Sequence, residues 1–197
     1  MASTAIPVRS RAFSLPNILT YGRMMAVPVV VALLFWSDDF WMRWLALAVY
    51  VLAGITDFLD GWLARVWEQQ SSLGRMLDPI ADKLLVAALL LMLVADHTIE
   101  SWSLWAAIVI LCREILVSGL REYLAELKVS VPVSKVAKWK TAAQLVALGF
   151  LIAGRSGDYL LPDTTRIGLA LLWIAALLTL YTGWDYMKAG VRHVMKD

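Results

Sequence analysis

The sequence predicts an all-α, polytopic membrane protein with six transmembrane helices and both termini in the cytoplasm. Hydrophobic residues make up 60% of its 197 residues, whereas soluble domains contain about 45–50%. Charged residues make up only 17%, and they gather between long apolar runs. These observations argue against a soluble domain. They exclude a disordered chain, collagen and a basic nucleic-acid-binding domain, and the net charge of +2 does not indicate a polyanionic partner.

Six runs approach the about 20 mostly apolar residues that a membrane-spanning helix needs. In chain order they are residues 18–36, 41–67, 77–95, 101–125, 135–153 and 167–186. The first run is expected to be retained, because it is long for a signal peptide, contains Arg23 and lacks a small-residue cleavage site. The connections are too short for an extramembrane domain, so residues 1–197 are predicted to form a single membrane domain.

The distribution of basic residues predicts the orientation. If residues 37–40 face outward, only Arg43, Arg155 and Arg166 lie near the outer face, and the other fifteen of the eighteen Lys and Arg residues lie on the inner side. This asymmetry predicts a multi-pass protein of the cytoplasmic membrane whose functional site faces the cytoplasm. Residues 1–15 carry Arg9 and Arg11 without an acidic residue, which is typical of a short interfacial segment on anionic headgroups.

Four aspartates lie where the membrane makes them costly. Asp57 and Asp60 are near the inner end of the second run, and Asp78 and Asp82 open the third. A carboxylate in apolar surroundings costs a few kcal/mol, so four within a short stretch require compensation. Carboxylate oxygens are preferred ligands of Mg²⁺ and Mn²⁺, and four of them suffice for two ions of the kind used in displacement at phosphorus.

The spacing of these residues supports a shared site. Asp57 and Asp60 fall on one face of a helix with the small residues Gly61 and Ala64. In the next segment Gly74, Asp78 and Asp82 follow each other at intervals of four, which is again one face if the helix is continuous. Two acidic faces with little side-chain bulk, joined by a short inner loop, can converge.

Other interpretations of these residues remain open at this point. Asp78 precedes Pro79, so it could be the N-cap of the third helix, with the proline at the first helical position. Asp57 and Asp60 could form a proton or cation relay in a divalent-cation transporter. Gly61 and Ala64 could simply be a helix-packing surface of small residues.

The aspartate pattern resembles the signature of the CDP-alcohol phosphotransferases. It reads Asp57-x-x-Asp60-Gly61-x-x-Ala64-Arg65, then eight residues, then Gly74-x-x-x-Asp78-x-x-x-Asp82. Every signature position is filled at a permitted spacing over 26 residues, which makes the match highly specific. The family transfers a phosphoalcohol from a CDP-linked donor to an acceptor hydroxyl and releases CMP.

The resemblance implies a role for each residue of the signature. Asp57, Asp60, Asp78 and Asp82 would hold two divalent cations, Mg²⁺ or Mn²⁺, and Asp82 would also act as the catalytic general base. The nucleotide site would include Asp57, Asp60, Gly61, Ala64, Arg65 and Gly74. Arg65 could equally serve as a topology anchor on the inner side. The resemblance also implies a homodimer.

Elsewhere the chain resembles bacterial members of the family that use CDP-diacylglycerol as donor and sn-glycerol 3-phosphate as acceptor. The matching segments are Leu15–Thr20 with Arg23, Arg113-Glu114, Ser118–Glu122, and Lys138-x-Lys140-Thr141 with Gln144. These segments are less diagnostic than the aspartates, so serine, an inositol phosphate or phosphatidylglycerol remain alternative acceptors.

Four basic residues suit an anionic acceptor. Arg113 and Arg121 lie eight positions apart in the fourth run, within about 80° of each other on a helix, and Lys138 and Lys140 open the fifth. A phosphomonoester bound bidentately would offset the cost of two guanidinium groups in a dry site. Alternatively, the arginines pair with Glu114, Glu122 or Glu126, and the lysines attract lipid headgroups.

Several further residues are weaker candidates. Asn17, Thr20, Arg23 and Thr141 are possible substrate-binding residues. His97 and His193 lie far from the acids in the sequence and are assigned no chemistry. The single cysteine, Cys112, lies inside an apolar run and is expected to be a buried thiol.

Overall fold

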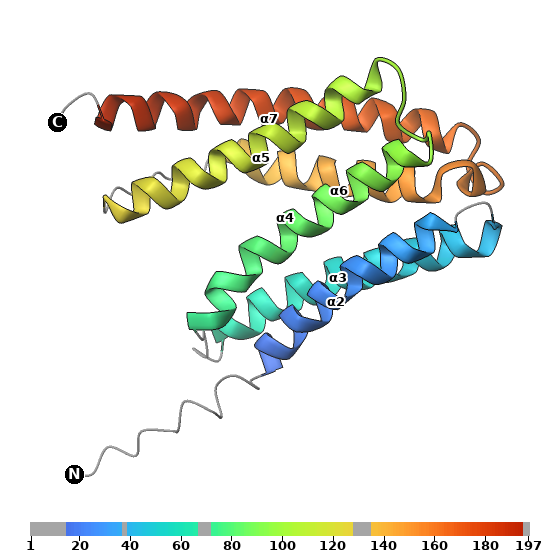
Figure 1. Cartoon of the computed structure of the whole chain (residues 1–197), viewed down its shortest axis with the longest axis horizontal. Helices are drawn as coiled ribbons and strands as arrows, with labels where there is room; N and C mark the ends of the chain where they lie inside the picture. The colour runs from blue at the N-terminus through green and yellow to red at the C-terminus, as the bar shows by residue number, and fades with distance from the viewer. Residues whose placement is uncertain (1–14, 37–38, 67–71, 128–134, 195–197) are drawn as a thin grey trace, which may run out of the picture. The chain divides into compact units, whose positions relative to one another are not determined.

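Each of the six apolar runs forms an α-helix in the computed structural model, which describes residues 15–36, 39–66, 72–127 and 135–194 (Figure 1). The helices are α2 (Leu15–Phe35), α3 (Phe40–Val66), α4 (Ser72–Ala95), α5 (Ser103–Glu126), α6 (Lys135–Gly157) and α7 (Thr164–Val194). No strand occurs in these described ranges. The predicted all-α fold is therefore confirmed, whereas the interfacial segment 1–15 lies almost wholly outside the described residues.

The start of α4 corrects one interpretation of Asp78. The helix begins at Ser72 and continues through Asp78 and Pro79, so Asp78 is not its N-cap. Pro79 removes one backbone donor, but the loss of one helical hydrogen bond does not stop the helix here. Because α4 is continuous, Gly74, Asp78 and Asp82 lie along one face of it, as the spacing predicted.

Four of the helices are long and apolar enough to cross a membrane. Within the described residues these are Ile18–Phe35, Phe40–Leu59, Ser103–Glu126 and Thr164–Lys188. The first halves of α4 and α6 carry charged residues, so neither helix contains a long window that is sufficiently apolar. The part of the chain that the structure describes is therefore a membrane-type all-α protein with four such helices.

The first compact unit, Met1–Met92, contains α2, α3 and most of α4. Helices α2 and α3 lie side by side (Figure 1). Val30 and Leu34 of α2 are fully buried, and Ala46 and Ala53 of α3 are buried as well. Their spacing forms one stripe on each helix, and the alanines let the helices approach closely. Arg23 is a buried charge nearer the start of α2, about two turns before Val30.

The second unit, Leu93–Asp197, contains α5, α6 and α7. Helix α7 packs against both α5 and α6. Leu148 and Leu151 of α6 and Leu172 of α7 are fully buried, as is Ile110 of α5. Near its end α6 is interrupted at Gly154, whose φ of 47° is a backbone conformation that favours glycine.

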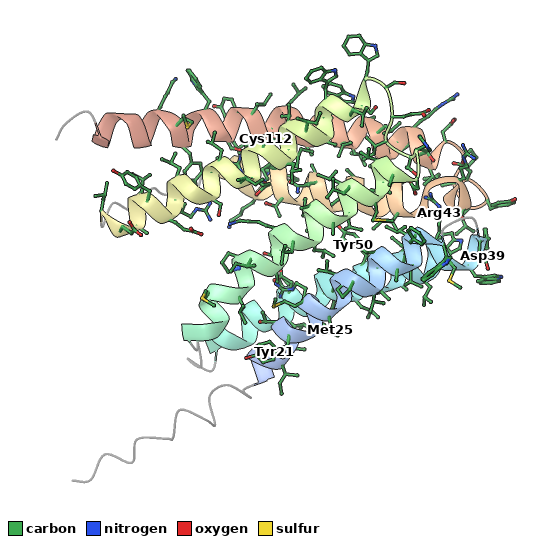
Figure 2. The ribbon with its side chains drawn as sticks, viewed as in Figure 1. Tyr21, Met25, Asp39, Arg43, Tyr50 and Cys112 are labelled. Carbon is green, nitrogen blue, oxygen red and sulfur yellow. The ribbon has the colours of Figure 1, made fainter. Side chains whose placement is uncertain are left out.

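Large apolar side chains are also exposed along the helices. Leu52, Phe58, Leu91 and Leu177 each expose more than half of their surface, which suits a lipid environment. Cys112 of α5 is exposed as well (Figure 2). The expectation of a buried thiol is therefore wrong, because an apolar residue of a membrane helix can face lipid as readily as a protein core.

Candidate active site

Two of the four predicted metal-binding aspartates converge on one arginine in the first unit. Arg23 lies on α2 between Tyr21 and Met25, which Figure 2 labels. Its Nη2 lies 2.6 Å from Oδ1 of Asp57 on α3, and its Nη1 donates to Oδ1 of Asp82 on α4 at 2.8 Å. The guanidinium fork thus joins three helices, and it brings together carboxylates that are 25 positions apart.

These carboxylates are accessible, whereas the arginine is not. The side chain of Arg23 is 1% exposed, that of Asp57 is 46% exposed and that of Asp82 is 54% exposed. Two carboxylates with hard oxygen donors, both in contact with one arginine and each about half exposed, have the chemistry that a divalent cation requires. The donor set present here therefore fits Mg²⁺ or Mn²⁺.

The other two aspartates lie on the same pair of helices. Asp60 follows Asp57 by three positions on α3, and Asp78 precedes Asp82 by four on α4. Their side chains lie outside the described residues, and the described side chains alone form no cluster of three potential metal ligands. The complete metal site with four aspartates therefore stays a prediction.

The proposed nucleotide site is described only by its backbone. Gly61, Ala64 and Arg65 belong to the last turns of α3, and Gly74 belongs to the first turn of α4. Their side-chain surroundings lie outside the described residues. The helical backbone keeps Gly61 and Ala64 on the face of α3 that carries Asp57.

Arg113 is held between α5 and α7 in the second unit. Its Nε donates to the carbonyl oxygen of Thr179 at 3.1 Å, and its Nη2 donates to the hydroxyl of Thr182 at 2.9 Å. Both threonines are buried, and the Arg113 side chain is 10% exposed. These contacts fix the plane of the guanidinium group and leave its Nη1 directed to Glu114 at 3.4 Å.

Glu114 is also in contact with a cation on α6. The Nζ of Lys140 donates to Oε1 of Glu114, the same oxygen that Arg113 contacts. Lys140 is 8% exposed and Glu114 is 19% exposed. One carboxylate therefore faces two nearly buried cations, which leaves this group with an excess of positive charge. Pairing with Glu114, one alternative expected for the arginines, is confirmed for Arg113, whereas the contact of Lys140 with Glu114 was not predicted.

Arg121 lies further along the face of α5 that contacts α7. Its Nη2 donates to the hydroxyl of Tyr186 at 3.4 Å, and its Cζ lies 5.5 Å from the centre of the Tyr186 ring, a distance typical of a cation–π contact. Lys138 is exposed on α6, and no contact of its side chain is described. The structure thus brings Arg113 and Lys140 together at Glu114. Arg121 contacts Tyr186, one turn after the threonines of α7 that hold Arg113. Lys138 has no described contact with either group.

Sequence reasoning did not find the residues of α7 that hold the arginines. Thr179, Thr182 and Tyr186 follow one another at intervals of three and four, so they form one stripe on the helix. Threonines on a single face of an otherwise apolar helix, next to Gly183, were the available signal. The stripe sets the position of Arg113 and Arg121 together.

The weaker candidates are distributed over both units. Thr20 is 2% exposed on α2, one turn before Arg23. Thr141 is exposed on α6. Asn17 is in the first turn of α2, and its side chain lies outside the described residues. None of these three has a described contact that assigns it to a substrate.

Gln144 differs from these candidates because it is 4% exposed on α6. Its side-chain oxygen has no hydrogen-bond partner among the described residues. It lies one helical turn after Lys140, on the same face of α6. A buried oxygen without a donor is unfavourable by about 1–3 kcal/mol, which makes Gln144 a candidate for contact with a bound molecule.

Comparison with known proteins decides the family. The family model described as CDP-alcohol phosphatidyltransferase matches residues 13–181. The chain belongs to this family. The CDP-alcohol phosphatidyltransferases are enzymes, and the matched range contains all four aspartates together with Arg113 and Lys140.

Curated relatives of the chain cover nearly its whole length. A protein of Rickettsia typhi is 47% identical over 89% of this chain and 96% of its own. One of Cereibacter sphaeroides is 38% identical over 94% of this chain and 98% of its own. One of Shigella flexneri serotype 5b is 39% identical over 90% of this chain and 94% of its own. All three bear the name CDP-diacylglycerol–glycerol-3-phosphate 3-phosphatidyltransferase.

Proposed function

We propose that this chain transfers the phosphatidyl group of CDP-diacylglycerol to sn-glycerol 3-phosphate, giving phosphatidylglycerophosphate and CMP. The observation that carries the proposal is the full-length similarity to relatives that share one name, at up to 47% identity. The buried cations of the second unit support an anionic acceptor. The exposed carboxylates of the first unit support chemistry at a diphosphate.

Asp82 is the proposed general base. Its carboxylate would accept the proton of the 1-hydroxyl of the acceptor, whose oxygen attacks the phosphorus nearer the lipid. A P–O bond to the acceptor forms while the anhydride P–O bond to CMP breaks. Two divalent cations held by Asp57, Asp60, Asp78 and Asp82 would neutralise the diphosphate and stabilise the charge of the departing CMP. Gly61 and Ala64 would leave room for the cytidine base.

The acceptor phosphate is proposed to bind Arg113 and Lys140. Glu114 offsets part of their charge before the acceptor binds, and a phosphate dianion would complete the compensation through charge-assisted hydrogen bonds. Arg121 and Lys138 would contribute at longer range. The unpaired oxygen of Gln144 offers an acceptor for one hydroxyl of the glycerol moiety.

The membrane arrangement completes the proposal. We infer that α4 and α6 cross the membrane together with the four helices that are long and apolar enough to do so, so that six spans leave both termini in the cytoplasm. The excess of inner-side basic residues supports this orientation. The catalytic aspartates would then face the cytoplasm at the inner leaflet of the cytoplasmic membrane, where a lipid donor can enter from the bilayer.

The proposal is tested by measuring which acceptor permits the release of CMP. Purified protein is incubated with CDP-diacylglycerol, Mn²⁺ or Mg²⁺ and one labelled acceptor at a time: sn-glycerol 3-phosphate, serine, an inositol phosphate or phosphatidylglycerol. We expect CMP only with sn-glycerol 3-phosphate, and none after addition of a chelator. Asp82→Asn serves as the matched variant, because it keeps the side-chain volume and removes the base. CMP release with another acceptor, or full activity of Asp82→Asn, would contradict the proposal.

The expected homodimer is part of the same proposal. The mass of the purified protein in detergent, corrected for bound detergent, tests it directly. A monomeric mass under conditions that retain activity would contradict it.

A further inference from the structure

Arg23 and the two aspartates that it contacts differ in their exposure. The guanidinium group is almost completely enclosed, with 1% of the side chain exposed, whereas Asp57 and Asp82 expose about half of theirs. Asp57 and Asp82 therefore each contact an enclosed guanidinium group while about half of each aspartate side chain stays exposed. A buried arginine is costly without anions, so the two carboxylates and the guanidinium group compensate one another.

The geometry of the contact is a shared fork. Nη2 reaches Asp57 and Nη1 reaches Asp82, so each terminal nitrogen holds a different helix. The guanidinium group is rigid and planar, so the fork fixes the separation and the orientation of the two carboxylates. A lysine would supply the same charge from a single point and would fix neither.

We propose that Arg23 is a positioning residue of the metal site, holding Asp57 and Asp82 from the buried side for a divalent cation that binds on their exposed side. This inference rests on the metal-dependent function proposed above. It assigns Arg23 a role through the aspartates instead of the substrate contact expected from the sequence. Partners that orient metal-binding side chains typically contribute 10–100-fold to metal affinity.

Two physical effects of Arg23 on metal binding have opposite signs. As a positive charge next to the ligands, Arg23 repels a cation, so its removal alone would tighten metal binding. As a fork, it holds the ligands in place, so its removal would weaken metal binding. The proposal commits to the second effect as the larger one, and a variant that keeps the charge but loses the fork separates the two.

The test measures binding of Mn²⁺ alone, without substrate or turnover. Full-length wild type, Arg23→Gln and Arg23→Lys are reconstituted in nanodiscs, and free Mn²⁺ is followed by electron paramagnetic resonance. Arg43→Gln is the matched control, because Arg43 is also a buried arginine, 7% exposed, and lies fourteen positions from Asp57 on α3, about 21 Å along the helix. Circular dichroism of each variant reports its helix content.

We expect both Arg23 variants to bind Mn²⁺ about 10–100-fold more weakly than wild type, and Arg43→Gln to bind as wild type does. Tighter binding by Arg23→Gln would show that charge alone matters and would overturn the proposal, as would unchanged affinity in both variants. If Arg23→Gln does not fold, Arg23→Lys decides, and wild-type affinity in that variant overturns the proposal.

The two proposals fail in different ways. A wild type that binds Mn²⁺ with the expected dependence on Arg23 but releases no CMP would refute the proposed function and leave the role of Arg23 intact. An active wild type whose Mn²⁺ affinity does not depend on Arg23 would refute only the positioning role. A wild type that binds no Mn²⁺ would refute the positioning role, whereas the release of CMP alone decides the proposed function.

Discussion

Arg113 of α5 lies directly across Gly183 of α7. A methyl group at position 183 would lie 3.2 Å from Cγ and 3.4 Å from Nε of Arg113. The same arginine is held by the carbonyl oxygen of Thr179 and the hydroxyl of Thr182. The absence of a side chain at Gly183 therefore allows the arginine to reach its partners on α7.

Gly183→Ala is expected to displace Arg113 and to raise the KM for sn-glycerol 3-phosphate about tenfold, the effect of about 1.4 kcal/mol. The donor KM should change little. Gly119→Ala is the control, because Gly119 has no atom within 4 Å of the added methyl group and alanine is the better helix former. Steady-state kinetics in mixed micelles measure both constants. An unchanged acceptor KM in Gly183→Ala would contradict the role of Arg113.

Glu114→Ala is expected to lower the free energy of unfolding by about 3 kcal/mol, because removing one partner of a buried ion pair leaves an uncompensated charge. Here Arg113 and Lys140 would both lose the same carboxylate oxygen. The loss is measured by chemical unfolding in mixed micelles. Glu122→Ala, an exposed glutamate of the same helix, should stay within about 0.5 kcal/mol of wild type. Equal losses in the two variants would contradict the prediction.

Gln144→Met is expected to separate stability from activity. Methionine has a similar volume and removes the buried oxygen that lacks a partner, so the free energy of unfolding should be unchanged or higher. The acceptor KM should rise, because the hydroxyl of the substrate loses its partner. A lower free energy of unfolding together with an unchanged KM would show that Gln144 serves the fold alone.

Cysteine labelling distinguishes six membrane spans from four. Cys112→Ser provides a background without cysteine, into which Glu100→Cys or Glu126→Cys is introduced. With six spans, position 100 is reached from outside by a membrane-impermeant maleimide and position 126 is not. If α4 and α6 did not cross, the two results would be exchanged. Asp158→Cys is labelled from outside in either case, so it reports that intact cells react.

The fold was predictable because apolar runs of about 20 residues specify spanning helices without any knowledge of packing. The errors occurred where tertiary context decides. A proline after Asp78 favours a helix start in isolation, yet α4 begins at Ser72 and passes through both residues. Cys112 lies in an apolar run, but an apolar run in a membrane protein does not reveal which face is turned to lipid.

The sequence indicated which types of residue belong to the candidate site, but it did not indicate which of them contact one another. Carboxylates and guanidinium groups in apolar runs stand out because placing a charge inside a membrane costs free energy and therefore requires a function or a partner. Their partners depend on the rotation of each helix about its axis, which the spacing along one helix does not determine. For this reason the pairing of Arg23 with Asp57 and Asp82 was missed, as were the threonines of α7 that hold Arg113.

The enclosed arginine of α2 also bears on how the protein is made. Acidic side chains without a compensating charge oppose the entry of a helix into the bilayer. A cation encoded in the chain itself is available from the moment α2, α3 and α4 meet. The negative charges of Asp57 and Asp82 are therefore partly compensated by a residue of the chain itself, without a metal ion.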